Sequence, residues 1–269
     1  MNLFDSHSHF NDEHFDNNLD EMINYVHNNG VEKLTVAGWN VDSSIKAIEI
    51  AKKYDFVYAT CGISPNDVDD SNRLNEIEEL IKNNSINNCG NIVDNSFKLV
   101  AVGEIGLDYY WNKDNKELQK RLFIEQIDLA NKYNLPIQIH TRDASIDTLT
   151  ILKEHPVNKK GIFHCCPLNQ ELIKGGLELG FYISFSGNVT FKNAKSANDC
   201  IKLVPLDRIL IETDSPYLTP EPNRGKRNDS SQVVYVAQKI ANVLEMPFDE
   251  IVDITNKNAC RIFNIKIDN

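Results

Sequence analysis

The chain has 269 residues, and its 28 lysines and arginines against 39 aspartates and glutamates give a net charge of −11 at neutral pH. This acidity argues against a broad, sequence-independent nucleic-acid surface, which would be basic. It does not exclude a small site where metal ions and a few basic side chains supply local positive charge. The length suits one large domain or two small ones, and no apolar run approaches membrane-spanning length.

The cysteines and the N-terminal residues indicate the compartment. The N-terminal segment predicts no secretion signal, because Asp5, Asp12 and Glu13 stand where a basic start and an apolar core are required. The six cysteines have no framework-like spacing, so we expect reduced thiols. We therefore expect a cytoplasmic protein with no membrane attachment, and no obligate protein partner is evident. The cysteines are Cys61, Cys89, Cys165, Cys166, Cys200 and Cys260.

Eight short apolar, β-branched segments follow one another along the chain. The predicted strands span residues 2–6, 33–38, 56–63, 98–106, 135–140, 160–165, 180–187 and 207–214. Helical patterns separate most of them and are clearest at 116–133, where apolar residues recur at helical spacing. Residues 231–265 predict two or three closing helices.

This alternation of strands and helices predicts an α/β fold with a parallel sheet. Eight such units predict a closed (β/α)8 TIM-like barrel, which we expect to form a single domain over residues 1–269. The alternative is an open doubly wound sheet. A Gly-rich phosphate loop after the first strand would favour that fold, and the sequence contains none there.

The first predicted strand leads into "FDSHSHF", where His7 and His9 are one residue apart. Residues i and i+2 of a strand point to the same face, so both imidazoles can be directed at one point. Taken alone, the pair fits a metal site and a solvated segment with two incidental histidines equally well.

Further potential ligands follow at the predicted ends of other strands, and in a (β/α)8 barrel the carboxyl ends of the strands form the active site. We therefore expect four histidines and two carboxylates to meet at one rim: His7, His9, Glu104, His140, His164 and Asp214. The remaining histidines, His14, His27 and His155, fall in helical or loop contexts and predict surface or packing roles.

Six ligands are too many for one catalytic ion with an open position. Two divalent ions that share a carboxylate suit them better, and the mixed imidazole and carboxylate set is compatible with Mg, Mn or Zn, as well as Fe or Co. Two ions about 3.5–4 Å apart activate a bridging water and stabilise the attacking and leaving oxygens. The pattern therefore favours hydrolysis, most naturally of a phosphodiester.

Five motifs carry a resemblance to a known family: "SHSHF", "VGEIGLDYYW", "IHTRDA", "SGNVTFKNAK" and "IETDSPYLTPEPNRGKRN". Together, in order from about Phe4 to Phe263, they resemble the TatD family of metal-dependent deoxyribonucleases, within the amidohydrolase superfamily. The resemblance implies a TIM-like barrel, a divalent-metal site that uses the six residues above, and DNA as the substrate. It also implies that Glu104 bridges the ions and that Asp214 serves as general base.

Three loops depart from the family pattern. In the first loop, "GISPN", Ser64 and Asn66 replace two imidazoles. In the second, the residues after His164 are "CCPLN", where "CFSGS" is typical. In the third, Glu221 stands where a histidine is usual. All six ligands are retained, so we expect a working metal site. We expect the substrate contacts, including those of Ser64 and Asn66, to differ.

Several other residues near the predicted rim have two interpretations. Arg142 holds a phosphate or forms a salt bridge to a neighbouring helix. Lys192 and the cluster Arg224, Lys226 and Arg227 line a nucleic-acid track or lie on a solvated loop. The aromatic run 109–111 stacks on bases or packs a loop. We expect no nucleophilic role for Cys165 or Cys166, because adjacent strand residues face opposite sides and at most one of the two faces inward. We expect none for Ser215 either, because no nucleophile elbow or partnered base surrounds it.

Three functional classes remain open from the sequence. The favoured class is a metal-dependent nuclease acting on DNA. The second is a hydrolase of the same superfamily that cleaves a C–N or ester bond, such as an aminoacyl ester on RNA. The third is a metal-binding protein with reduced activity, which the replacements at Ser64 and Asn66 suggest.

Overall fold

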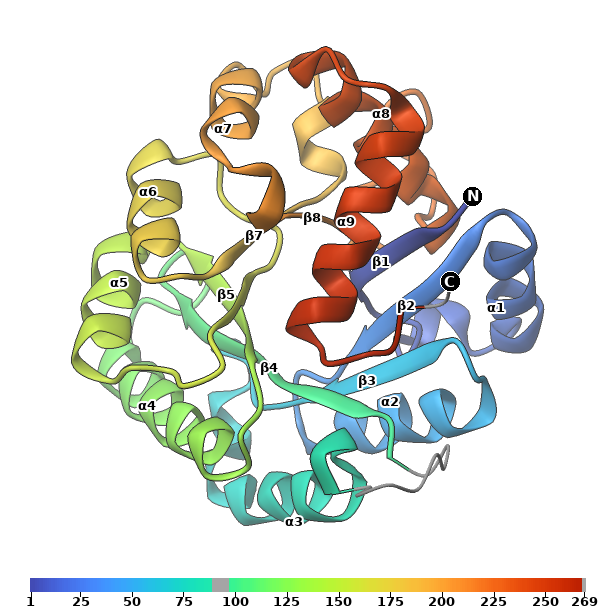
Figure 1. Ribbon diagram of the computed structural model, residues 1–269. Helices are drawn as coiled ribbons and strands as arrows, with labels where there is room; N and C mark the ends of the chain where they lie inside the picture. Colours follow the sequence, from blue (N-terminus) through green and yellow to red (C-terminus); the bar gives the residue numbers. More distant parts are fainter. Residues whose placement is uncertain (89–96, 268–269) are drawn as a thin grey trace.

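The computed structural model describes residues 1–88 and 97–267, and it contains a ring of eight parallel strands surrounded by helices (Figure 1). Each strand pairs with the next one along the chain, so the sheet order follows the sequence. The strands are β1 Leu3–Ser8, β2 Val31–Ala37, β3 Val57–Cys61, β4 Leu99–Asp108, β5 Ile137–Arg142, β6 Gly161–Phe163, β7 Tyr182–Phe185 and β8 Ile209–Ile211. The predicted (β/α)8 barrel is confirmed.

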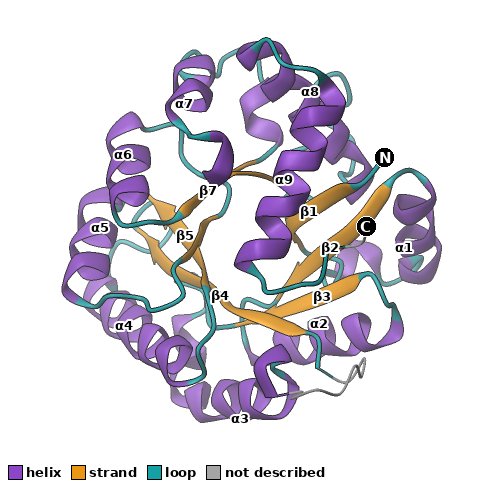
Figure 2. Cartoon of the chain, viewed as in Figure 1, coloured by secondary structure: helices purple, strands orange, loops and turns teal. Residues whose placement is uncertain are grey.

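Helices cover the outer face of this ring (Figure 2). Within the described residues they are α1 Leu19–Asn28, α2 Val41–Lys53, α3 Leu74–Asn84, α4 Lys116–Lys132, α5 Ser145–Glu154, α6 Gln170–Glu178, α7 Ala197–Leu203, α8 Val233–Leu244 and α9 Phe248–Ile262. Their apolar faces pack on the strands and form one large core. None of the helices in the described ranges is long and apolar enough to cross a membrane.

The last helix closes one end of the barrel. In Figure 1, α9 crosses in front of the ring of strands. Phe263, just after α9, belongs to a second apolar cluster with Phe4 of β1, Val100 of β4 and Leu210 of β8. These residues lie near the amino ends of their strands, so α9 covers the amino end and the carboxyl end remains for a site.

The first and last strands meet in a seam. No ladder pairs β8 with β1 among the described residues. Two backbone hydrogen bonds cross there instead, from His9 N to Ser215 O (2.7 Å) and from Asp214 N to His7 O (3.0 Å). The buried Asp5 carboxylate adds to them by accepting from Thr213 N at 2.9 Å. The backbone of three candidate ligands, His7, His9 and Asp214, thus helps to join the seam.

Candidate metal centre

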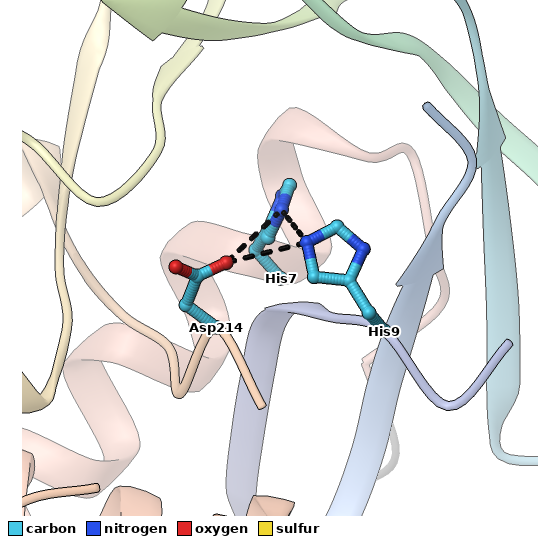
Figure 3. A group of neighbouring side chains, drawn as sticks. All are labelled: His7, His9 and Asp214. Atoms are coloured by element: carbon cyan, nitrogen blue, oxygen red, sulfur yellow. Dashed lines mark hydrogen bonds and ion pairs between the residues drawn. The ribbon is translucent and has the colours of Figure 1, made fainter. Parts of the chain in front are cut away.

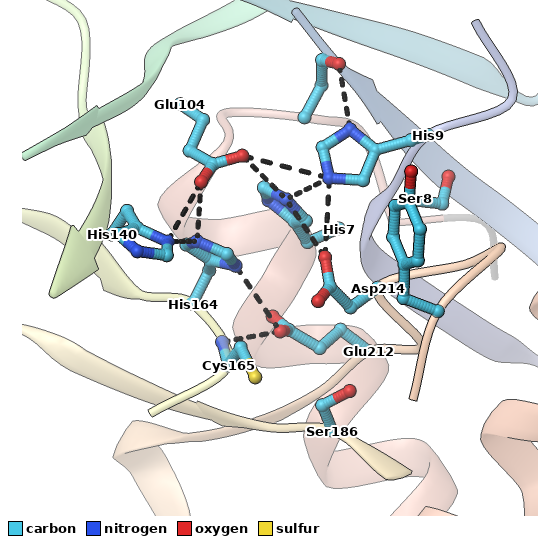
Figure 4. A network of polar contacts seen from close by, with 12 residues as sticks. His7, Ser8, His9, Glu104, His140, His164, Cys165, Ser186, Glu212 and Asp214 are labelled. Carbon is cyan, nitrogen blue, oxygen red and sulfur yellow. Dashed lines mark hydrogen bonds and ion pairs between the residues drawn. The ribbon is translucent and has the colours of Figure 1, made fainter. Parts of the chain in front are cut away.

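The six predicted ligand residues come together at the carboxyl end of the barrel (Figure 4). His7 lies in β1 and His9 just after it, while His164 and Asp214 follow β6 and β8. The prediction that Glu104 and His140 end their strands was wrong. β4 and β5 continue to Asp108 and Arg142, because their ladder pairs three further residues beyond Ile105.

A close approach between β4 and β5 fixes the position of His140. Gly106 has a φ of +139°, and a Cβ added there would lie 2.0 Å from the carbonyl oxygen of His140. Only glycine fits this position without displacing the backbone that carries a candidate ligand.

One group of ligand atoms forms across the seam (Figure 3). The Nε2 atoms of His7 and His9 are 3.2 Å apart. Asp214 Oδ1 lies 3.8 Å from His7 Nε2 and 3.3 Å from His9 Nε2. Three potential ligand atoms from the first and last strand regions thus surround one point.

The hydrogen bonds of these two rings fix where their protons are. His7 Nδ1 lies 2.8 Å from Gln138 Oε1, and Gln138 Nε2 donates to Ser6 O, so this amide oxygen is an acceptor. His9 Nδ1 lies 3.2 Å from Ala37 O, which also only accepts. In the neutral form each ring therefore carries its hydrogen on Nδ1 and presents an Nε2 lone pair to the other ring. Two facing lone pairs repel unless a proton or a metal ion lies between them, so this group can hold a metal ion.

Glu104 links that group to a second pair of histidines (Figure 4). Its Oε1 lies 2.9 Å from His140 Nδ1 and 3.3 Å from His164 Nε2. Its Oε2 lies 3.7 Å from the Nε2 atoms of both His7 and His9. The two oxygens of one buried carboxylate thus face two different histidine pairs.

Three polar residues that the sequence analysis missed orient these ligands. Asp108 Oδ2 lies 3.0 Å from His140 Nε2, and Gln138 binds His7 as described above. Glu212 Oε1 lies 3.6 Å from His164 Nδ1. Each lies two or four residues from a ligand on the same strand or strand end. The two-residue period that identified His7 and His9 would also have identified them.

The electrostatics of the centre favour positive charge at its middle. Burial alone raises the pKa of Glu104, but His164, His140 and His7 outweigh it and hold that pKa well below its usual range. Burial lowers the pKa of His164, but Glu104 and Glu212 outweigh it and raise that pKa well above the ordinary value. Protons on imidazoles and divalent cations therefore compete for the same place.

A cavity of about 770 Å³ opens directly above the six ligands. Ser64, Asn66 and Arg142 line it, and so do all of the six ligand residues except His7. The buried Ser64 hydroxyl donates to Asp67 at 2.8 Å, and Asn66 Nδ2 lies 3.4 Å from Asp108 Oδ2. The two residues that replace family imidazoles thus lie at the site.

Aromatic side chains surround Arg142 at the mouth of this cavity. Its guanidinium lies 3.8 Å from the ring centre of Tyr110 and 5.4 Å from that of Trp111. These two side chains are 46% and 66% exposed, so neither is a core residue. Tyr109 instead packs inward, and its hydroxyl donates to Asp147. Among the described residues, Arg142 has no salt bridge to a helix, which leaves its fork of N–H donors available.

The other predicted basic residues lie outside the lining of the cavity. Lys192 is exposed, and Arg224 lies over the Phe191 ring at 4.1 Å. Lys226 Nζ donates to Asn223 Oδ1 at 3.2 Å. Arg227 donates to the backbone oxygen of His14 at 2.6 Å. The structure therefore brings Arg142 to the ligands but places these four residues on surrounding loops.

None of the described cysteines forms a disulfide, and Cys89 lies outside the described residues. Cys165 lines the cavity, whereas Cys166 is buried away from it. Burial, followed by the nearby Asp214 and Glu212, raises the pKa of the Cys165 thiol well above its ordinary value. A thiol held in its neutral form is a poor nucleophile.

Comparison with known proteins identifies the family of this chain. The model of the family described as TatD related DNase matches residues 4–264. The metal-dependent hydrolase YabD of Bacillus subtilis is 45% identical over 98% of this chain and 99% of its own length. YcfH of Escherichia coli, also named a metal-dependent hydrolase, is 35% identical over 98% and 97%.

A solved structure of a TatD homolog has the same fold. The crystal structure of the TatD homolog YjjV from Escherichia coli matches with a TM-score of 0.89 and 26% identity, over 98% of both chains. The chain belongs to the TatD related DNase family.

Proposed function

We propose that this TatD family member is a divalent-metal-dependent hydrolase that cleaves phosphodiester bonds of DNA. The observation that carries the proposal is the position of Glu104, whose two oxygens face two separate histidine pairs. A carboxylate in this position suits two cations rather than one. His7, His9 and Asp214 would hold one cation, His140 and His164 the other, and Glu104 both.

When bound, the two cations would lower the pKa of a water and stabilise charge on the phosphate oxygens. Asp214 approaches His7 and His9 through Oδ1, which leaves Oδ2 to accept the proton of the attacking water. Asp108 and Gln138 hold the rings of His140 and His7 in the tautomers that ligate metal.

Arg142 would hold the substrate. Its guanidinium rests on Tyr110 at the mouth of the cavity. Two of its N–H groups could donate to one phosphate there without any movement of the backbone. Ser64 and Asn66 would contribute neutral hydrogen bonds beside it. Lys192, Arg224, Lys226 and Arg227 would meet DNA beyond the cavity. Catalysis would take place within a single domain, residues 1–269, in the cytoplasm. It would need no obligate protein partner.

Metal analysis coupled to a nuclease assay tests the proposal. The protein would be loaded with Mg, Mn or Zn and assayed on single-stranded, double-stranded and abasic DNA, with an aminoacyl ester on RNA as a further substrate. We expect two ions per chain and cleavage of DNA. Hydrolysis of the aminoacyl ester alone would replace the nuclease by the second functional class, and two bound ions without turnover on any substrate would support the third.

Glu104→Ala tests the bridging role. The variant should lose hydrolysis, because both cations lose a shared ligand and the histidines then face uncompensated positive charge. Glu171→Ala is the matched control, since this exposed carboxylate on α6 contacts Lys174 and is remote from the centre. Near wild-type hydrolysis by Glu104→Ala with metal present would contradict the two-metal assignment.

A further inference from the structure

A second cavity lies at the opposite end of the barrel from the metal centre. Its volume is about 300 Å³, and none of its lining residues lines the cavity above the ligands. Val100 near the start of β4 and Tyr182 at the start of β7 form part of its wall. Phe263 and Asn264, which follow α9, form another part. The cavity thus lies between the barrel and the helix that closes its amino end.

The charged residues that line this cavity are all basic among the described residues. They come from three separate segments, namely the turn before β6, the turn before β8 and the end of α9, and are Lys159, Lys160, Arg208 and Arg261. The whole chain has 39 acidic and 28 basic residues. The charge of the cavity lining is therefore positive, whereas the net charge of the whole chain is negative.

The neighbours of these side chains balance little of their charge. Arg208 has an ion pair with Asp207 (2.8 Å) and lies 5.1 Å from the ring centre of Tyr182. Arg261 Nη1 donates to the neutral amide oxygen of Asn258 at 3.2 Å. In the described ranges, Lys159 and Lys160 form no ion pair. Like charges that converge on one hollow repel one another, and a bound anion relieves that repulsion.

We propose that this basic cavity binds a small phosphate-bearing metabolite. Arg and Lys together suit phosphate, which arginine binds as a fork and lysine as a point charge. The volume is at the low end of the range for ligand cavities, about 300–1,000 Å³, which favours a small molecule over a polymer. Amide side chains of Asn87 and Asn134 and the apolar Phe263 also line the cavity and offer contacts to the rest of such a ligand.

Binding here would link three parts of the fold. The basic residues belong to the turns before β6 and β8 and to α9, so one anion would hold α9 against the barrel. A ligand that binds only the folded state stabilises it by an amount that grows with ligand concentration. The inference therefore predicts a phosphate-dependent rise in melting temperature that does not depend on the metal centre.

The experiment is a titration of the metal-loaded protein with inorganic phosphate at constant ionic strength, with chloride as the reference salt and melting temperature as the readout. Phosphate also binds metals, so the titration is repeated with Glu104→Gln. We expect stabilisation in both proteins. In Arg208→Gln with Arg261→Gln, the apparent affinity should fall about tenfold or more, because two charge-assisted contacts are lost.

Two further variants complete the test. Lys159→Gln with Lys160→Gln should show a similar loss, which guards against misfolding of the arginine variant. Lys52→Gln with Lys153→Gln removes the same charge from the exposed faces of α2 and α5 and should behave as wild type. Equal affinity in both cavity variants and wild type would overturn the proposal. Loss of stabilisation in Glu104→Gln alone would also overturn it, since phosphate would then bind only at the metal centre.

Discussion

Asp108 is a residue whose removal tests the metal centre without removing a ligand. Its Oδ1 accepts hydrogen bonds from the backbone nitrogens of Tyr110 (2.8 Å) and Trp111 (2.9 Å), and its Oδ2 lies 3.0 Å from His140 Nε2. Burial raises the pKa of Asp108, but His140 and the two backbone donors outweigh it and lower that pKa. An ionised carboxylate only accepts, so His140 carries a proton on Nε2, and its Nδ1, which lies 2.9 Å from Glu104 Oε1, is the nitrogen that would bind a cation in place of a proton.

In Asp108→Asn, the two backbone donors would keep Oδ1 in place, so the amide nitrogen would take the position of Oδ2. A donor would then face the N–H of His140. The neutral ring would then keep its proton on Nδ1, the nitrogen 2.9 Å from Glu104, and Nδ1 could no longer bind a metal. Loss of such an outer partner costs about 10–100-fold in metal affinity or activity. That corresponds to about 1.4–2.7 kcal/mol.

The assay is calorimetric metal titration together with hydrolysis measured against metal concentration. Excess metal should restore part of the activity of Asp108→Asn, since the defect lies in binding. Asp147→Asn is the matched control, because this carboxylate accepts from the Tyr109 hydroxyl at 2.7 Å and contacts no histidine in the described structure. Wild-type metal affinity in Asp108→Asn, or an equal loss in Asp147→Asn, would refute the tautomer argument.

Three further outcomes are expected. Replacing Arg224, Lys226 and Arg227 by glutamine should weaken DNA binding and lower the slope of log K against log salt by about one unit or a little less per lost phosphate contact; an unchanged slope would show that the loop is merely solvated. Ser64→His with Asn66→His should raise turnover on DNA more than it changes metal binding, because general acid catalysis contributes about 10²–10⁴-fold; unchanged turnover with bound metals would favour another substrate. Chelation should lower the melting temperature, since about 2.7 kcal/mol is lost when an ion had been present at 100 times its Kd; an equal chelator effect on Glu104→Ala would contradict this account.

The barrel and its rim were predictable because both depend on local periodicity. The strands are short apolar runs, and helical patterns separate most of them. The six candidate ligands were predicted because they are polar side chains at the expected carboxyl ends of strands. The rule failed in detail at Glu104 and His140, because pairing between β4 and β5 continues beyond them. The length of a ladder depends on both strands, and one strand's sequence does not contain it.

Contacts made by loops were not predictable in the same way. Arg227 was assigned either to a nucleic-acid track or to a solvated loop, and neither alternative included the hydrogen bond from its guanidinium to the backbone oxygen of His14, 213 residues earlier in the chain. Tyr217 and Trp39 line the cavity from loops without regular periodicity. Their positions depend on how the barrel packs as a whole. The basic cavity below the barrel was missed for the same reason, since its four cations come from three distant segments.

The seam between β1 and β8 has a consequence for how the protein is made. Asp5 and Thr213, which hydrogen-bond across it, are 208 residues apart, and the proposed trio of His7, His9 and Asp214 spans the same gap. A nascent chain that ends before β8 still carries five of the six proposed ligands but cannot assemble that trio. Hydrolytic activity would then begin only when the ribosome has delivered the last strand. Prematurely terminated products would be inert, which is a useful property if the enzyme cleaves DNA, as proposed, in the cell that makes it.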